Sequence, residues 1–236
     1  MTMVSAPIDL DAIAAAPVAR EPFPWFMVPG FVKAEALDAI NADFPAVAHA
    51  GSFPLPTLTY GPAFERFMDA IRGPDFARAV AAKLGIDLAR RPTMVTVRGI
   101  SAERDGQIHT DSTTKLVTVL IYMNGKWEAP GGRLRLLRSA DDLNDVIAEV
   151  PPDEGTLLVF ENRPNAWHGF EAFAGPRRVI QLNWVTNGRV VWWEQTRHKV
   201  SAFVKGLGRS PLPLAGEVGE RSEPGEGTSR VPLPLT

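Results

Sequence analysis

The segment GQIHTDSTTKLVTVLIYMN, residues 106–124, contains two residues that can bind a metal ion, His109 and Asp111. They lie two positions apart at the start of a run whose β-branched and aromatic residues predict a strand. Residues i and i+2 of a strand point to the same face, so the imidazole and the carboxylate are expected to reach one point above a sheet. The pattern therefore predicts half of a metal site.

The rest of such a site must use nitrogen and oxygen ligands, because the 236-residue chain contains no cysteine. Of the other histidines, His168 lies in a second strand-like run, whereas His49 and His198 lie outside the pattern. Two histidines and one aspartate from separate strands can occupy one face of an octahedral iron(II) ion and leave three positions open. A single histidine in a strand is more often structural than a ligand, so the prediction depends on the combination of His109, Asp111 and His168.

The sequence pattern of the elements that must position these residues changes from helical to strand-like near residue 93. Before it, the runs VKAEALDAINADFP, PAFERFMDAIRG and PDFARAVAAKLG have helical spacing, and the last two begin with Pro and end with Gly. After it, seven short β-rich runs follow one another without regular intervening helices, which favours a barrel or sandwich over a parallel α/β sheet. The acidic run SADDLNDVIAEV is expected to interrupt them as a short helix or a long loop.

We predict three regions: helices and loops over residues 1–92, packed on a β core over 93–205, and a disordered tail over 206–236. The tail repeats PLPL and is rich in Pro, Gly, Glu and Ser, a composition that buries too little apolar surface to offset its ordering entropy. The chain has 25 Lys and Arg against 27 Asp and Glu, which argues against a nucleic-acid partner. No secretion signal or membrane span is evident, so a cytoplasmic location is expected.

The stretch from Met94 to Val185 resembles the iron(II)- and 2-oxoglutarate-dependent dioxygenases, and within them the prolyl-hydroxylase-like branch. The runs HTDSTTKLVTVLIYMN, GGRLRLL, GTLLVFEN, WHGFE and RRVIQLNW occur in the order found in that family. The resemblance implies a mainly β fold with N-terminal helices, built on a double-stranded β-helix, a jelly-roll or cupin-like barrel. It also implies that His109, Asp111 and His168 bind Fe(II).

The same resemblance implies that an arginine nine to eleven residues after the distal histidine pairs with the far carboxylate of 2-oxoglutarate. Arg177 and Arg178 both lie in this window. Arg178 is the prediction, because Trp184 follows it at a spacing typical of the prolyl-hydroxylase branch, and strand alternation then turns Arg177 to the opposite face. Tyr122 matches a tyrosine that supports the same carboxylate, although an ordinary strand aromatic is an equal interpretation.

Arg98 departs from the family pattern, since close relatives carry a tyrosine on the strand before the H-x-D motif. It is expected to contact the cosubstrate or an acidic substrate, or to pair with a surface carboxylate; the sequence leaves these interpretations open. The predicted cofactors are Fe(II), 2-oxoglutarate and O2, and ascorbate is a further one that the resemblance allows.

The resemblance implies an enzyme that hydroxylates a C–H bond in a small-molecule or peptidyl substrate and releases succinate and CO2. Because Asp111 supplies the carboxylate ligand, hydroxylation is favoured over halogenation. The alternative from another class is a cupin-like metal- or sugar-binding protein without turnover, which would not need the arginine. Nucleic-acid repair by a relative of the same fold is a third interpretation, which the charge balance disfavours. The substrate and the oligomeric state are not predicted.

Overall fold

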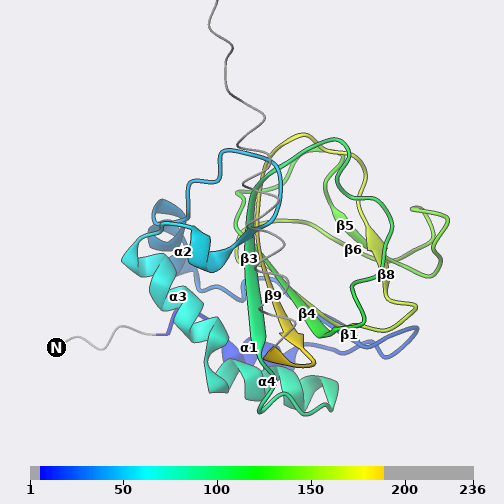
Figure 1. Ribbon diagram of the computed structural model, residues 1–236, viewed down its shortest axis with the longest axis horizontal. Coiled ribbons are helices and arrows are strands. Elements are labelled where there is room, and N and C mark those ends of the chain that lie inside the picture. Colours follow the sequence, from blue (N-terminus) through cyan, green and yellow to red (C-terminus); the bar gives the residue numbers. More distant parts are fainter. Residues whose placement is uncertain (1–5, 189–236) are drawn as a thin grey trace, which may run out of the picture.

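Two antiparallel sheets form the centre of the computed structural model, which describes residues 6–188 (Figure 1). The larger sheet contains, in spatial order, β1 (Trp25–Val28), β7 (Leu157–Glu161), β4 (Lys115–Tyr122), β9 (Gly175–Val185), β3 (Thr93–Ser101) and β2 (Phe53–Pro54). The smaller sheet contains β6 (Val146–Val150), β5 (Leu134–Leu137) and β8 (Trp167–Gly169). The predicted mainly β fold, a double-stranded β-helix, is confirmed.

The two sheets face each other across a shared apolar core. Tyr122 and Val179 from the larger sheet pack in one cluster with Leu134, Leu136 and Val150 from the smaller sheet. The interior is therefore lined by alternate residues of each strand, as the period of two requires. The remaining alternate residues of the larger sheet face the other way.

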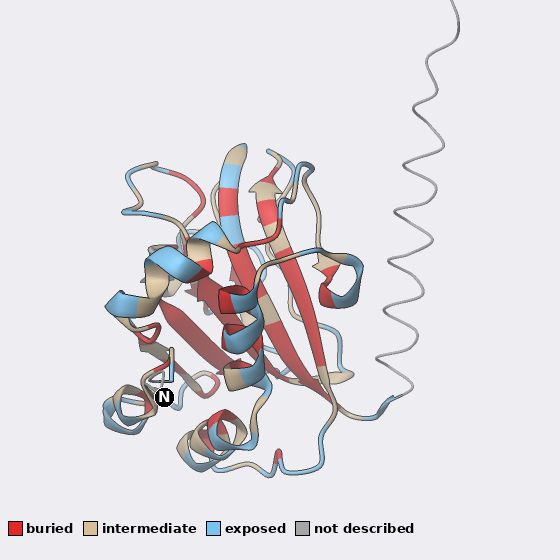
Figure 2. Cartoon of the chain, turned by 90° about the vertical axis from the view of Figure 1, so that its left-hand side faces the viewer, coloured by how far each residue is buried: buried red, intermediate tan, exposed pale blue. Residues whose placement is uncertain are grey.

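The outer face of the larger sheet is covered by helices, so this sheet is buried on both sides (Figures 1 and 2). The helical elements are α1 (Leu10–Ala15), α2 (Ala34–Ala42), η1 (Leu55–Thr57), α3 (Pro62–Arg72) and α4 (Pro74–Leu84). Three of them, α2 to α4, confirm the predicted helices, and α4 ends at Gly85 in the left-handed conformation, with φ of 77°. Phe76 on α4 stacks on Trp184 of β9, with ring centroids 5.9 Å apart. None of these described helices has the length and apolarity needed to span a membrane.

The N-terminal region contributes strands as well as helices. Strand β1 pairs with β7 and strand β2 pairs with β3, so residues 25–28 and 53–54 form the two edges of the larger sheet. Residues before 93 thus share one sheet with the region after it. The predicted tail over 206–236 and the strand-like run RVVWWEQ lie outside the described residues.

The acidic segment SADDLNDVIAEV differs from the prediction in its second half. Residues 146–150 form β6, which pairs with β5 in the smaller sheet, while only the preceding residues form a loop. The acidic residues of this segment favour a loop, but pairing with β5 stabilises the strand. Glu149 lies opposite Arg135, and their side chains form an ion pair at 2.9 Å across the two strands.

Candidate metal centre

His109, Asp111 and His168 converge at one end of the barrel interior, with one ligand atom of each within 4.8 Å of the others. His168 lies on β8, and His109 and Asp111 lie in the segment that leads into β4. A backbone bridge joins the two histidines: each amide nitrogen donates to the other residue's carbonyl oxygen at 3.0 Å. This pairing holds the two rings 4.3 Å apart, centroid to centroid, so local backbone structure brings together ligands that are distant in sequence.

Both imidazoles are held through Nδ1. His168 Nδ1 lies 3.0 Å from the Ala166 carbonyl oxygen and His109 Nδ1 lies 2.8 Å from the Gln107 carbonyl oxygen. Because a carbonyl oxygen only accepts, each Nδ1 carries the proton and each Nε2 keeps its lone pair for a metal. Burial lowers the pKa of His168 to about 4, against the opposing effect of Asp111. The buried ligand is therefore neutral near pH 7, which is the form that binds a cation.

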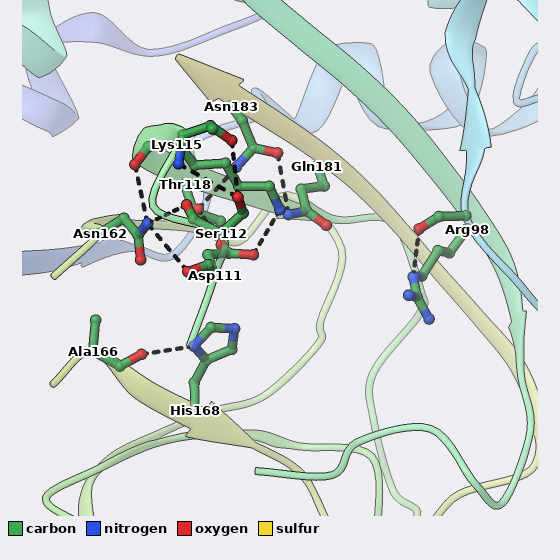
Figure 3. Close-up of polar contacts among 12 residues, drawn as sticks. Arg98, Asp111, Ser112, Lys115, Thr118, Asn162, Ala166, His168, Gln181 and Asn183 are labelled. Atoms are coloured by element: carbon green, nitrogen blue, oxygen red, sulfur yellow. Dashed lines mark hydrogen bonds and ion pairs between the residues drawn. The ribbon is translucent and has the colours of Figure 1, made fainter. Parts of the chain in front are cut away.

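The Asp111 carboxylate is fixed by donors on β4 (Figure 3). Lys115 Nζ donates to Oδ1 at 2.6 Å and the Thr118 hydroxyl donates to Oδ2. Burial raises the pKa of the Asp111 carboxyl, but the Lys115 ammonium group, His168 and these hydrogen bonds outweigh it, so the pKa lies below its usual value. Asp111 is therefore an anionic ligand.

A chain of hydrogen bonds extends from Thr118 along the inner face of the sheet. Asn183 Nδ2 donates to the Thr118 hydroxyl at 2.8 Å, and Gln181 Nε2 donates to Asn183 Oδ1 at 3.2 Å. Asn162 holds the neighbouring loop from the other side by donating to the carbonyl oxygens of Ser112 and Lys115. These partners limit the rotation of Asp111, as the outer hydrogen bonds of metal ligands commonly do.

The donor set fits iron(II). Two neutral imidazole nitrogens and one carboxylate oxygen are the ligands of non-haem iron oxygenases, and they leave coordination positions open. Structural zinc sites, by contrast, are closed by four protein ligands. The three residues open onto a cavity of about 520 Å³ lined by both sheets, so a ligand can approach the metal from inside the barrel.

Arg177 lines this cavity and is 3% exposed. Its guanidinium carbon lies 4.2 Å from the ring centroid of Phe170 and 5.5 Å from that of Tyr122, and its Nε donates to the Gly132 carbonyl oxygen at 2.8 Å. Gly132 has φ of 81°, and a Cβ there would lie 2.8 Å from Trp127, so the turn that offers this carbonyl requires glycine. No carboxylate of the described residues forms a salt bridge with Arg177. Burial lowers its pKa, as expected for a desolvated cation.

The Tyr122 hydroxyl is a second unsatisfied group on the same cavity wall. It is fully buried and makes no hydrogen bond of good geometry within residues 6–188, although the Arg177 guanidinium lies over its ring and close enough to interact with its oxygen. Burial raises the pKa of this hydroxyl, and the adjacent Arg177 guanidinium offsets only part of that rise, so the hydroxyl stays protonated and can donate. A buried cation without a carboxylate partner, beside a buried hydroxyl with no acceptor, is costly without a ligand that has acceptor oxygens.

Arg178, which the sequence analysis placed in the barrel, lies on the opposite face of β9, so that prediction was wrong. Its side chain is exposed and lies over the Phe44 ring, 5.0 Å from the centroid. The physical reason is strand alternation: Arg178 shares its face with Trp184, which packs under α4, whereas Arg177 shares its face with Val179 and Gln181. The spacing to Trp184 therefore indicated the wrong one of the two adjacent arginines.

Arg98 lies on β3 and lines the cavity, on the side away from Asp111 (Figure 3). Its Nε donates to the Ser52 hydroxyl at 2.8 Å, and its Nη1 lies 3.6 Å from Asp105 Oδ2, too far for a hydrogen bond. Pairing with a carboxylate was one of its predicted interpretations, and the loose contact with Asp105 supplies such a partner. The orientation toward the cavity leaves the other two interpretations open.

Sequence reasoning missed the residues that support Asp111, namely Lys115, Thr118, Asn162 and Asn183. Two of them carried a usable signal: Thr118 and Asn183 are polar residues at alternate positions in otherwise apolar strand runs. Polar residues on the buried face of a strand indicate a polar function at that face. Asn162 follows a strand and its role depends on the loop that it contacts, so only the structure reveals it.

Residues 98–186 match the family model described as the 2OG-Fe(II) oxygenase superfamily. The matched region belongs to this superfamily. It contains the three metal-binding candidates and the buried arginine, and members of the superfamily use Fe(II), 2-oxoglutarate and O2. Over this region the predicted family, enzyme class (a 2-oxoglutarate-dependent dioxygenase) and cofactors are therefore confirmed. No curated protein matches the chain.

Among solved structures, the chain is similar to a prolyl-4-hydroxylase from Pseudomonas putida, with a TM-score of 0.51 and 18% identity, over 76% of this chain and 97% of that one. It is also similar to a viral collagen prolyl hydroxylase from Paramecium bursaria Chlorella virus-1, with a TM-score of 0.48, 15% identity and coverage of 69% and 96%. The first similarity shows a shared fold, and at this identity it shows nothing finer.

Proposed function

We propose that the oxygenase hydroxylates a C–H bond of a small-molecule or peptidyl substrate and converts 2-oxoglutarate and O2 to succinate and CO2. His109, Asp111 and His168 would hold Fe(II), which supplies the oxygen activation when bound. The observation that carries the proposal is the buried Arg177, which has no carboxylate partner within residues 6–188 and lies in the same cavity as the three metal-binding candidates. The site offers three metal ligands at one place and a cation without a carboxylate partner at another, which suits a compound that would chelate a metal through one end and has a carboxylate at the other.

Arg177 and Tyr122 would bind the far carboxylate of 2-oxoglutarate. A guanidinium presents parallel N–H donors that match the two oxygens of a carboxylate, and the Tyr122 hydroxyl would add a third donor. Phe170 lies against the guanidinium and limits its contact with water, so the charge pair would form in a poorly solvated place, where it is strong. The cupin-like alternative, metal binding without turnover, gives no reason to bury this arginine.

The proposal is tested by the two adjacent arginines, which serve as matched variants. Arg177→Gln should raise the 2-oxoglutarate dissociation constant of the Mn(II)-loaded protein about thirty-fold or more, since removal of one partner of a buried charge pair costs at least about 2 kcal/mol. Arg178→Gln removes the same charge from an exposed side chain on the other face of β9 and should change this dissociation constant little. Calorimetric titration without oxygen measures both variants.

A turnover measurement separates the oxygenase from a binding protein. The Fe(II)-loaded chain should release succinate from 2-oxoglutarate in air, and His168→Ala should abolish this release and weaken Mn(II) binding, because one of three ligands is lost. Metal binding without any succinate, or full succinate release by His168→Ala, would contradict the proposed function.

A further inference from the structure

The cavity is positively charged although the chain as a whole carries a formal net charge of −2. Its charged lining consists of four cations against two carboxylates: Arg98, Arg104, Lys115 and Arg177 against Asp105 and Asp111. The cavity therefore has an excess of two positive charges, with its histidines counted as neutral. A cavity of one sign with low-dielectric walls concentrates ligands of the opposite sign.

The proposed iron and cosubstrate do not remove this excess. Fe(II) and 2-oxoglutarate carry equal and opposite formal charges, so the loaded cavity would keep the same balance. Within it, Arg177 would pair with the cosubstrate, and Lys115 is already paired with Asp111 at 2.6 Å. The cations that remain for another ligand are Arg98 and Arg104.

Neither of these two arginines is firmly paired. Arg98 has one hydrogen bond through Nε, to Ser52, and its approach to Asp105 at 3.6 Å joins side chains that are 33% and 20% exposed. Such a partly exposed pair is weak, because water screens it, and it gives way to a better acceptor. Asp105 is held independently, since its Oδ2 accepts from the Ala102 amide at 3.0 Å. Arg104 is exposed and forms no hydrogen bond or ion pair with another residue of the described range 6–188.

We propose that the substrate of this oxygenase is an anion whose carboxylate or phosphate group binds Arg98 and Arg104 in the part of the cavity that the cosubstrate leaves free. This inference rests on the proposed function, because it takes Arg177 as the partner of 2-oxoglutarate. The Nη groups of Arg98, which have only the loose contact with Asp105, and the guanidinium of Arg104 provide donors for two or three anionic oxygens. The proposal also assigns Arg98 to the binding of the substrate and not of the cosubstrate.

The test uses inorganic phosphate and acetate as probes of the full-length protein loaded with Mn(II) and 2-oxoglutarate, without oxygen. Calorimetry should detect one saturable site, and Arg98→Gln and Arg104→Gln should each raise the dissociation constant of the tighter probe at least about five-fold. Arg178→Gln, which removes a charge outside the cavity, should change it less than about two-fold. The tighter of the two probes indicates whether the natural group is a phosphate or a carboxylate.

Three further measurements make the result decisive. Probe binding should persist without metal, because neither arginine is a metal ligand, and it should not compete with 2-oxoglutarate. Arg98→Gln should weaken 2-oxoglutarate binding far less than Arg177→Gln does. Absence of saturable binding, binding that requires metal or is displaced by 2-oxoglutarate, or equal loss in Arg178→Gln would overturn the inference. Failure of 2-oxoglutarate itself to bind the wild-type protein would instead overturn the proposed function.

Discussion

Asp111 differs from the two histidines in how it is supported. Each histidine needs one carbonyl oxygen to fix its tautomer, whereas both carboxylate oxygens of Asp111 accept hydrogen bonds, from Lys115 and from Thr118. A carboxylate can bind a metal through either oxygen and in several orientations, so its direction must be imposed by donors. The row from Thr118 through Asn183 to Gln181 supplies that constraint from a rigid strand pair.

Thr118→Val tests this support at nearly constant side-chain volume. Loss of the hydroxyl should weaken Mn(II) binding about ten-fold or more, because Asp111 loses a donor and Asn183 loses an acceptor. Thr96→Val is the control, since it removes a hydroxyl from the same cavity on β3 without changing either donor to Asp111. Electron paramagnetic resonance of free Mn(II) measures both; equal affinities in the two variants would show that the Thr118 hydrogen bond is not needed.

At the scale of elements, strand β9 separates two functions by its alternation. Arg177, Val179, Gln181 and Asn183 face the cavity, while Ile180, Leu182 and Trp184 face the helices. One strand thus contributes to the chemistry on one side and to the main core on the other. Mutations on its two faces should therefore have separable effects.

Trp184→Ala should destabilise the fold and spare the site. Trp184 is 2% exposed and stacks on Phe76, and removal of a large buried aromatic side chain costs about 3–5 kcal/mol. Urea unfolding should show this loss, while the folded fraction at low urea keeps its 2-oxoglutarate affinity. Arg177→Gln should instead weaken 2-oxoglutarate binding and leave the urea unfolding of the protein nearly unchanged. A Trp184→Ala protein that is fully stable but fails to bind 2-oxoglutarate would refute this division of β9.

Local patterns predicted most of these elements, and the limits of that prediction are physical. The helices α3 and α4 begin and end at Pro and Gly, and the long strands alternate, so both were readable from sequence. Two adjacent arginines on β9 were not separable by pattern, because the face of each depends on which strand neighbours and helices it meets. Strand β6 was hidden in an acidic run, since its pairing with β5 comes from distant residues. The three metal-binding candidates could be named because few residue types serve as ligands in a chain without cysteine.

At the scale of the whole molecule, the N-terminal region completes the barrel and does not form a separate layer on it. It provides both edge strands of the larger sheet and the helices that bury the outer face of β4 and β9. An edge strand that loses its neighbour exposes unpaired backbone groups. Without residues before 93, both edges and one entire face of the sheet would be open to water.

A chain that begins at residue 93 should therefore fail to fold, although it retains all three metal-binding candidates and Arg177. Deletion would expose the apolar face formed by Val117, Val119, Ile180, Leu182 and Trp184, which is buried in the intact protein, and each such side chain costs about 1.5–3 kcal/mol when exposed. Exposure of all five would cost about 7.5–15 kcal/mol, which is as large as the whole stability of about 5–15 kcal/mol typical of a domain. Circular dichroism during heating should show no cooperative transition, and the fragment should not bind Mn(II) with 2-oxoglutarate. A fragment that unfolds cooperatively and binds both would show that the N-terminal region is a separable addition and that the metal centre needs only the later strands.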